Sequence, residues 1–161
     1  MTIRDLRICD DVWEAAAPLR RADWRANIDD LVVDARLLPP YTDRYLLVTP
    51  GDDATEIEFL DDDGVVAARV IIPHAATAEE LDEYLDVIRR MDAEAHRRDL
   101  LEALDMGKKV VHDAAAMALA RAVPGLAEDH RTYRKLFTLL VALRVDTTNL
   151  AHARGHGFRS F

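Results

Sequence analysis

The spacing of hydrophobic and polar residues changes along the N-terminal part of the chain. In residues 2–9 apolar and polar side chains alternate, which predicts a short strand. Residues 12–38 follow a helical period, and the apolar residues on one face of this helix are Trp24, Ile28, Leu31, Val32 and Ala35. We expect Pro18 to begin or kink the helix, because proline lacks the amide hydrogen that a helix interior requires. Pro39-Pro40 is expected to end it.

Three strand-like runs follow, separated by two short turns. The runs cover residues 45–48, 56–60 and 65–72. The turn at 61–64 reads Asp-Asp-Asp-Gly, which is typical of a hairpin because aspartate favours turns and glycine accepts a positive φ. Since short turns join antiparallel neighbours, the pattern predicts a three-stranded antiparallel meander, to which residues 2–9 would add a fourth strand.

The chain from Thr77 to residue 146 has the period of three further helices. Thr77 with Glu80 predicts a capping box at the first, whose core face would comprise Leu81, Tyr84, Leu85, Ile88 and Met91. Asp99 is expected to cap a second helix that reaches about Ala122, before Pro124-Gly125. A third helix is expected over roughly residues 130–145.

Strands followed by helices indicate an α+β fold. We expect the short antiparallel meander to pack against a layer of the three C-terminal helices, together with the one N-terminal helix. Residues 1–146 would form a single α+β domain, and residues 147–161, which show little apolar periodicity, would form a flexible C-terminal tail.

Charge and composition narrow the classes of protein that this chain could belong to. Acidic residues outnumber basic ones 30 to 21, giving a formal charge of −9, which disfavours binding to nucleic acid. No apolar run reaches the ~18 residues that a membrane span requires, and the N-terminus lacks the apolar core of a signal peptide. Cys9 is the single cysteine, which excludes an intrachain disulfide and fits a reducing compartment. We therefore expect a cytoplasmic protein.

The stretch LDMGKKVVHD at residues 104–113 mixes an apolar helix face with several reactive types of side chain. Gly107 falls within the apolar stripe of Leu100, Leu104, Gly107, Val111, Ala114 and Ala118. A glycine inside a helix costs ~1 kcal/mol, so we expect Gly107 to lie where a neighbouring helix comes close. Asp105, Lys109 and Asp113 form a ladder at spacings of four, and Asp105, Lys108 and His112 share one flank. These groups would either solvate the helix edge or line a groove for a partner or ligand.

Single motifs in the sequence suggest more specific chemistry. Gly107-Lys108 lacks the upstream glycine of a phosphate-binding loop, and Ser160 is the only serine. His112-Asp113, with His96 upstream, is the best candidate for a His-Asp metal site, although no downstream aspartate stands out. His152 and His156 have a zinc-like spacing in the expected tail, where further ligands are lacking.

Two C-terminal motifs resemble those of a known bacterial family. They read Asp105-Met106-Gly107-Lys108-Lys109-x-x-His112 and Tyr133-Arg134-Lys135-Leu136-Phe137-Thr138-Leu139. They resemble uncharacterised protein family 0262, whose first motif usually reads Asp-Met-Gly-Arg-Arg-Gly-Leu-His-Asn, and the likeness extends over most of residues 2–146. The chain looks like a divergent member, since Lys108 and Lys109 replace arginines and Arg144 stands where histidine is common. The family has no established reaction, so the resemblance implies an architecture rather than an activity.

These observations favour a non-enzymatic protein-interaction or regulatory module that uses a charged helical face. The candidate partner-binding residues are Asp105, Lys108, Lys109, His112, Arg134 and Lys135. We expect a protein partner, and we expect no cofactor and no binding to nucleic acid or to a membrane. The sequence leaves the oligomeric state open, with a homodimer as one option. The alternative is a small metal-dependent hydrolase of the His-Asp type, centred on His112 and Asp113.

Overall fold

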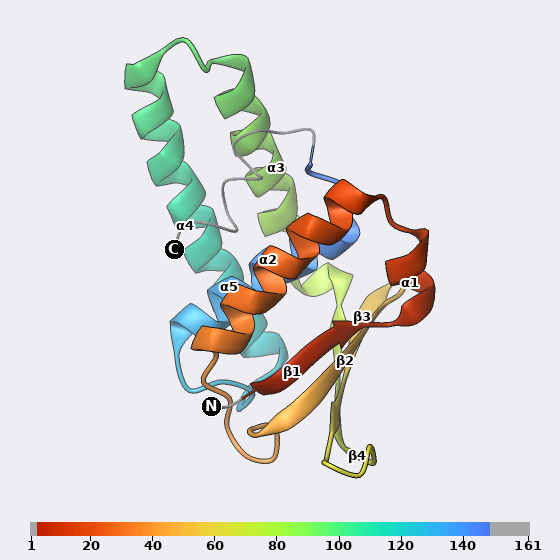
Figure 1. Cartoon of the computed structure of the whole chain (residues 1–161). Coiled ribbons are helices and arrows are strands. Elements are labelled where there is room, and N and C mark those ends of the chain that lie inside the picture. The colour runs from red at the N-terminus through yellow and green to blue at the C-terminus, as the bar shows by residue number, and fades with distance from the viewer. Residues whose placement is uncertain (1–2, 149–161) are drawn as a thin grey trace.

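The computed structural model describes residues 3–148, which form four strands, one short 3-10 helix and five α-helices (Figure 1). In chain order these elements are β1 (Ile3–Ile8), α1 (Asp10–Ala15), α2 (Pro18–Asp34), β2 (Arg44–Pro50), β3 (Ala54–Leu60), β4 (Val66–Pro73), the 3-10 helix (His74–Thr77), α3 (Ala78–Ala93), α4 (Arg98–Ala122) and α5 (His130–Arg144). The α+β class is therefore confirmed, with strands preceding most of the helices.

The four strands form one mixed sheet in the order β1-β2-β3-β4. The meander of β2, β3 and β4 is antiparallel, as predicted. The fourth strand expected over residues 2–9 is present as β1, but it pairs with β2 in parallel, so the sheet is mixed, with Leu6 opposite Leu46 and Ile8 opposite Val48. The reason lies in the connection: α1 and α2 carry the chain back to the starting end of β1 before β2 begins, and a helical crossover of this length joins parallel strands.

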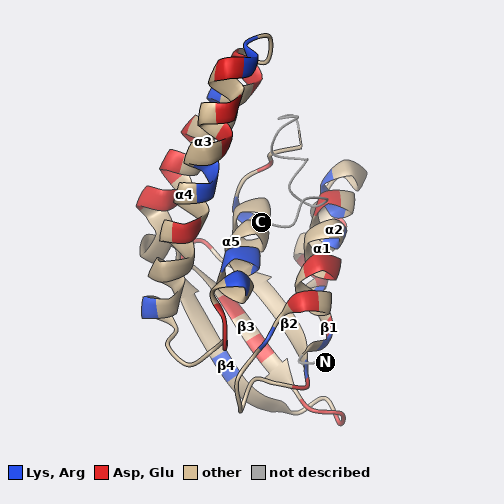
Figure 2. Ribbon diagram, turned by 90° about the vertical axis from the view of Figure 1, so that its left-hand side faces the viewer, with Lys and Arg blue, Asp and Glu red and all other residues tan. Residues whose placement is uncertain are grey.

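The helices lie on one side of the sheet, and α5 is central among them (Figure 2). It packs against α2 on one flank and against α4 on the other, while α3 packs against α4. The hairpin of α3 and α4 projects beyond the end of the sheet (Figure 1). A single cluster of buried apolar side chains joins the inner face of the sheet to α2, α3, α4 and α5. Among the described residues, no helix is both long enough and apolar enough to span a bilayer.

The helix predictions differ from the structure mainly at helix ends. The helical run over 12–38 is divided into α1 and α2, with Pro18 as the first residue of α2, and α2 stops at Asp34 because Ala35 is extended. All five predicted core residues of α3 are buried, which confirms its face. The predicted caps are wrong: Thr77 makes no side-chain capping hydrogen bond, and Asp99 lies in the first turn of α4 instead of at the cap. Asp129 is the residue that caps, since its carboxylate accepts a hydrogen bond from the backbone amide of Thr132.

The expectation for Gly107 is also wrong. A Cβ atom at this position would meet nothing within 4 Å, so none of the other described helices comes close to it. The buried face of α4 is rotated away from the predicted stripe because Lys108 and His112 are both buried. A hydrophobic pattern places two such polar residues outside, which shifts the apparent core face toward Gly107.

Two residues of the predicted C-terminal tail can be placed. Thr147 and Thr148 are buried, and the backbone amide of Thr148 donates a hydrogen bond to the Asp146 carboxylate at 3.1 Å. The rest of the predicted tail, including His152 and His156, lies outside the described residues.

Candidate functional site

The six side chains predicted to bind a partner do not line one groove. Lys108 and His112 are buried on the inner side of α4, and both have interaction partners. Arg134 and Lys135 lie on opposite flanks of α5, toward α4 and toward α2 respectively. Asp105 and Lys109 remain on the surface and form an ion pair with each other at 3.5 Å. Partner binding by this set therefore stays a prediction, and the structure assigns most of its members to internal contacts.

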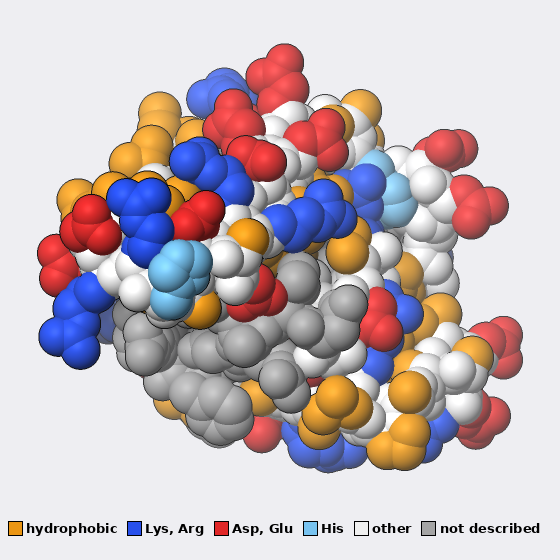
Figure 3. All heavy atoms as spheres, turned by 90° about the horizontal axis from the view of Figure 1, so that it is seen from above, with side chains coloured by type: hydrophobic (Ala, Val, Ile, Leu, Met, Phe, Trp, Pro, Cys, Tyr) orange, Lys and Arg blue, Asp and Glu red, His pale blue; other side chains and the backbone are white. Residues whose placement is uncertain are grey.

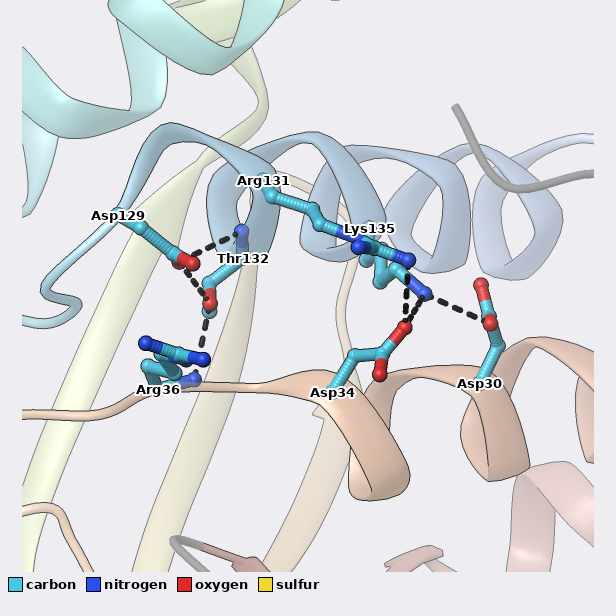
Figure 4. A network of polar contacts seen from close by, with 7 residues as sticks. All are labelled: Asp30, Asp34, Arg36, Asp129, Arg131, Thr132 and Lys135. Atoms are coloured by element: carbon cyan, nitrogen blue, oxygen red, sulfur yellow. Dashed lines mark hydrogen bonds and ion pairs between the residues drawn. The ribbon is translucent and has the colours of Figure 1, made fainter.

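Lys135 belongs to a polar network between α5 and α2 (Figure 4). Its side chain is only 5 % exposed, and its ammonium group lies 2.7 Å from the Asp30 carboxylate and 2.5 Å from the Asp34 carboxylate. Arg131 contacts Asp34 at 2.9 Å. The hydrogen bond from Lys135, followed by the nearby positive charges, lowers the pKa of Asp34 below its usual value. This network joins two helices and leaves the Lys135 cation with little surface to offer a partner.

The same end of α5 is fixed by hydroxyl and carboxylate groups. Asp129 accepts hydrogen bonds from the amide and the hydroxyl of Thr132. The Thr132 hydroxyl in turn accepts a hydrogen bond of 2.9 Å from the backbone amide of Arg36, which follows α2 (Figure 4). Together with the Lys135 network, these contacts fix the position of α2 against α5.

His112 is a core residue in the structure. Its imidazole stands edge-on to Tyr84 of α3, at 5.1 Å between ring centroids, and to Phe137 of α5, at 5.5 Å. Burial, followed by the positive charges of Arg134 and Lys108, lowers the pKa of His112 to about 3. The ring is therefore neutral at physiological pH and joins three helices by aromatic packing.

Asp113 lies on the exposed side of α4, away from the buried His112 ring. Its carboxylate is 3.1 Å from the His130 imidazole and 3.4 Å from the Arg134 guanidinium. Nowhere in residues 3–148 do three or more His, Cys, Asp or Glu side chains gather in a way that could hold a metal ion. The hydrolase alternative at His112 and Asp113 therefore gains no supporting observation.

Charged side chains of both signs alternate over the helical end of the molecule. Seen from above, acidic, basic and hydrophobic side chains are mixed, and neither sign forms a continuous area on the part of this face that is described (Figure 3).

A groove runs between the edge strand β1 and helix α2. It has a volume of about 300 Å³, within the range of ligand sites. Its β1 wall consists of four consecutive residues: Asp5, Leu6, Arg7 and Ile8. Successive side chains of a strand point to opposite faces of a sheet, so four in a row can line one groove only along the strand's edge. The groove therefore follows the free backbone edge of β1.

The opposite wall of this groove comes from α2 and α1. Arg25, Ile28 and Asp29 recur at i, i+3 and i+4 on one side of α2, and Trp13 and Asp10 of α1 complete the lining. The charged side chains of the groove form no ion pair with one another within the described residues, unlike those of the network between α2 and α5. These charges remain available to a bound ligand.

Trp13 connects the groove to a second hollow on the outer side of α2. The guanidinium of Arg25 lies 5.1 Å from the Trp13 ring and that of Arg21 lies 5.9 Å from it. Arg21 is held there by hydrogen bonds to the carbonyls of Trp13 and Glu14. The hollow measures about 560 Å³ and shares Trp13, Arg25 and Asp29 with the groove. The two spaces therefore adjoin at Trp13.

Comparison with known protein families finds one family that this chain matches. A family model described as "Uncharacterised protein family (UPF0262)" matches residues 2–146. The chain belongs to UPF0262. No curated protein and no solved structure matches it.

The UPF0262 motifs of this chain lie in the helix-packing region and not at the groove. The first motif, residues 105–112, is on α4, and the second, residues 133–139, is on α5, and these two helices pack together. His112 of the first motif contacts Phe137 of the second, and Lys135 contacts α2. In this chain the buried members of the motifs, such as His112, Lys135 and Phe137, therefore help to pack α5 against its neighbours, whereas Asp105, Met106 and Lys109 lie at the surface.

The sequence did not predict the groove, because its walls come from residues that meet only in the tertiary structure. Residues 2–9 were predicted as a strand, but nothing in them shows that β1 ends the sheet. Trp13 and Arg25 are 12 positions apart and come together only because α1 folds back against α2. The single local clue was an aromatic residue on a short, partly exposed helix.

Proposed function

We propose that this UPF0262 protein is a non-enzymatic protein-binding module, and that it binds an extended segment of its partner in the groove between β1 and α2. The observation that carries the proposal is the wall of four consecutive residues along β1, since it exposes a strand edge to a cavity. Adding a strand to such an edge is a recurring way of binding peptides. The class of function is the one expected from the sequence, and the proposed surface is a different one.

The backbone of β1 offers hydrogen-bonding groups to such a segment. The amide of Cys9 donates to the Val48 carbonyl at 3.0 Å, so the residues at alternate positions before it also face β2. The intervening residues, Leu6 and Ile8, therefore turn their N–H and C=O groups toward the free edge. These main-chain groups would supply affinity without depending on the partner's sequence.

The side chains around Trp13 would supply selectivity. Ile28 and the Trp13 ring give an apolar surface, while Arg25 and Arg21 place two guanidinium groups beside it. Guanidinium groups favour carboxylates, and they do so more strongly in partly desolvated sites. We therefore expect bound segments to combine an apolar side chain with an acidic residue.

The test is selection from a phage-displayed peptide library on the purified full-length chain. Peptides that are enriched would be titrated while the tryptophan emission is followed, since Trp13 lines the groove and Trp24, the second of the two tryptophans, is buried. Arg25→Glu should weaken binding by at least about tenfold, and Trp13→Phe should remove most of the fluorescence change. The backbone amide signals of Leu6 and Ile8 should shift on binding in NMR spectra.

The matched control is Arg89→Glu, which makes the same change of charge at an exposed position on α3. It should leave the affinity unchanged. Peptides that bind equally well to the Arg25→Glu protein, or that shift only amides remote from β1, would contradict the proposal.

A further inference from the structure

Helix α4 exposes a row of large apolar side chains on the side opposite the core. Met106, Val110 and Met117 are 60 %, 64 % and 55 % exposed, and their spacings of four and seven place them on one face. Ala103 and Ala114 lie on the same face. None of these residues contributes to the buried core of the described chain.

This face is the outer side of the helical hairpin. The inner side of α4 packs on α3 and α5 through residues that include Leu104, Val111 and Leu119. In Figure 1, α4 forms the outer edge of the molecule, and no other described helix or strand lies against its outer side. Three large apolar side chains exposed in one row are unusual on a protein surface, and no contact within residues 3–148 covers them.

We propose that this face binds the same face of a second copy of the chain, with the two α4 helices antiparallel and Val110 at the two-fold axis. In a symmetric antiparallel pair of helices, the residue numbers of two residues that lie opposite each other always add up to the same value. With Val110 opposite itself, Met106 lies level with Ala114 of the partner copy, and Met117 lies level with Ala103. Each long side chain is thus matched by an alanine, which allows the two surfaces to interdigitate.

The charges at the two ends of the row obey the same symmetry. Asp99 lies on this face before Ala103, and Arg121 lies on it after Met117, both exposed. The antiparallel register that pairs the apolar residues also pairs Asp99 with Arg121 of the second copy. Within residues 3–148 the ion pair that Asp99 forms is a weak, exposed one with Arg97 at 3.8 Å, so Asp99 is available for this pairing. A parallel arrangement would instead place like charges together at both ends, which disfavours it.

This self-association surface is independent of the proposed peptide groove, because α4 contributes no residue to the lining of that groove. Either proposal can fail without the other. The contact has only three large apolar residues per copy, so we expect a weak dimer with a dissociation constant of roughly 1–100 μM.

The first test measures molar mass by analytical ultracentrifugation of the full-length chain over a range of concentrations. The wild-type protein should change from monomer to dimer across the micromolar range. Val110→Glu places two carboxylates together at the two-fold axis and should leave a monomer with an unchanged circular dichroism spectrum. The matched control is Val33→Glu, the same substitution at a 76 % exposed position on α2, and it should dimerise normally.

The second test examines orientation. Asp99→Arg and Arg121→Asp should each weaken the dimer, and the double charge swap should restore it. In a Cys9→Ser background, Val110→Cys should form an intermolecular disulfide under mild oxidation. Ala103→Cys should not link to itself but should link to Met117→Cys when the two proteins are mixed.

The outcomes separate this proposal from other ways of covering the face. A protein that stays monomeric at several hundred micromolar, or a dimer that Val110→Glu leaves intact, would overturn it. Self-linking of Ala103→Cys would indicate parallel helices and would overturn the register. Protection of Met106 and Met117 in a strict monomer would assign the face to another part of the same chain.

Discussion

Two sides of helix α2 use charged residues in opposite ways. Toward α5, Asp30 and Asp34 hold the buried ammonium of Lys135, and Arg131 adds a further ion pair. Toward β1, Arg25 and Asp29 line a groove and form no ion pair with its other charged residues within the described chain. The same kinds of side chain thus stabilise the fold on one side of the helix and remain available on the other.

The physical difference is how far the partners are removed from water. A buried cation that has lost its hydration must keep its carboxylates, because leaving it unpaired costs several kcal/mol. A charge at a groove keeps much of its hydration, so it tolerates having no partner and can exchange water for a ligand. The charges predicted as a binding face are therefore structural where they are buried, and the better binding candidates are those without internal ion-pair partners.

The largest effect should come from breaking the buried side. Lys135→Met removes two charge-assisted hydrogen bonds, leaving Asp30 without this partner and Asp34 with Arg131, so we expect the free energy of unfolding to fall by about 3 kcal/mol in urea titrations. Lys109→Met breaks the exposed pair with Asp105 and should change it by less than about 0.5 kcal/mol. Similar losses for the two variants would show that the Lys135 network does not stabilise the fold.

The pH dependence of stability provides a second, slightly smaller effect. The pKa of His112 is lowered from 6.5 in the unfolded chain to about 3, so below pH 6.5 the unfolded state binds a proton that the folded state does not. This stabilisation is complete above pH 6.5 and is lost as the pH falls toward 3, by about 2–3 kcal/mol between pH 7 and 4.5. Replacing the ring by His112→Phe should flatten this part of the curve.

The contribution of Asp34 to stability changes at lower pH than that of His112. Because its folded pKa lies below the unfolded value of 3.8, its contribution is present above that value and is lost as the pH falls through the lower folded pKa. The His112→Phe protein should therefore keep a stability loss below pH 4. Urea titrations of both proteins from pH 7 to pH 3 measure the two ranges; a curve for His112→Phe that matches the wild type would contradict the assignment of His112.

The substitution Gly107→Ala tests the effect of helix propensity on stability at a surface position of α4, which lies on neither side of α2. The new methyl group would meet nothing within 4 Å, so only the helix propensity changes, and the protein should become more stable by about 0.5–1 kcal/mol. Thermal unfolding, at a protein concentration low enough to avoid self-association, measures this change in stability. A loss of stability would mean that the position is more crowded than the geometry indicates.

The smallest effect on stability is expected at the groove. Arg25→Glu removes a guanidinium that lies over Trp13, and we expect a loss of about 0.5 kcal/mol in the free energy of unfolding. The same variant should lose most of its peptide affinity. A variant that unfolds readily would instead place Arg25 among the structural charges, and the contrast between the two sides of α2 would disappear.

Local sequence patterns predicted the helices and strands well wherever the buried residues are also the hydrophobic ones. The meander, the face of α3 and the start of α2 at Pro18 were all readable, because alternation, a 3.6-residue period and proline chemistry act over a few residues. The face of α4 was misjudged because Lys108 and His112 are buried polar residues, which no hydrophobic pattern can place inside. The capping role of Asp129 was missed, although the threonine three positions later was a usable signal.

The sequence by itself determined the α+β class, the antiparallel meander and the membership of the uncharacterised family, since these depend on local spacing and on motifs. Only the tertiary structure decided which charges are partnered, that β1 joins the sheet in parallel at its edge, and that Trp13 meets Arg25 beside it. The reason is that pairing and edge position depend on contacts between residues far apart in the chain, and a linear pattern contains no direct measure of these distances.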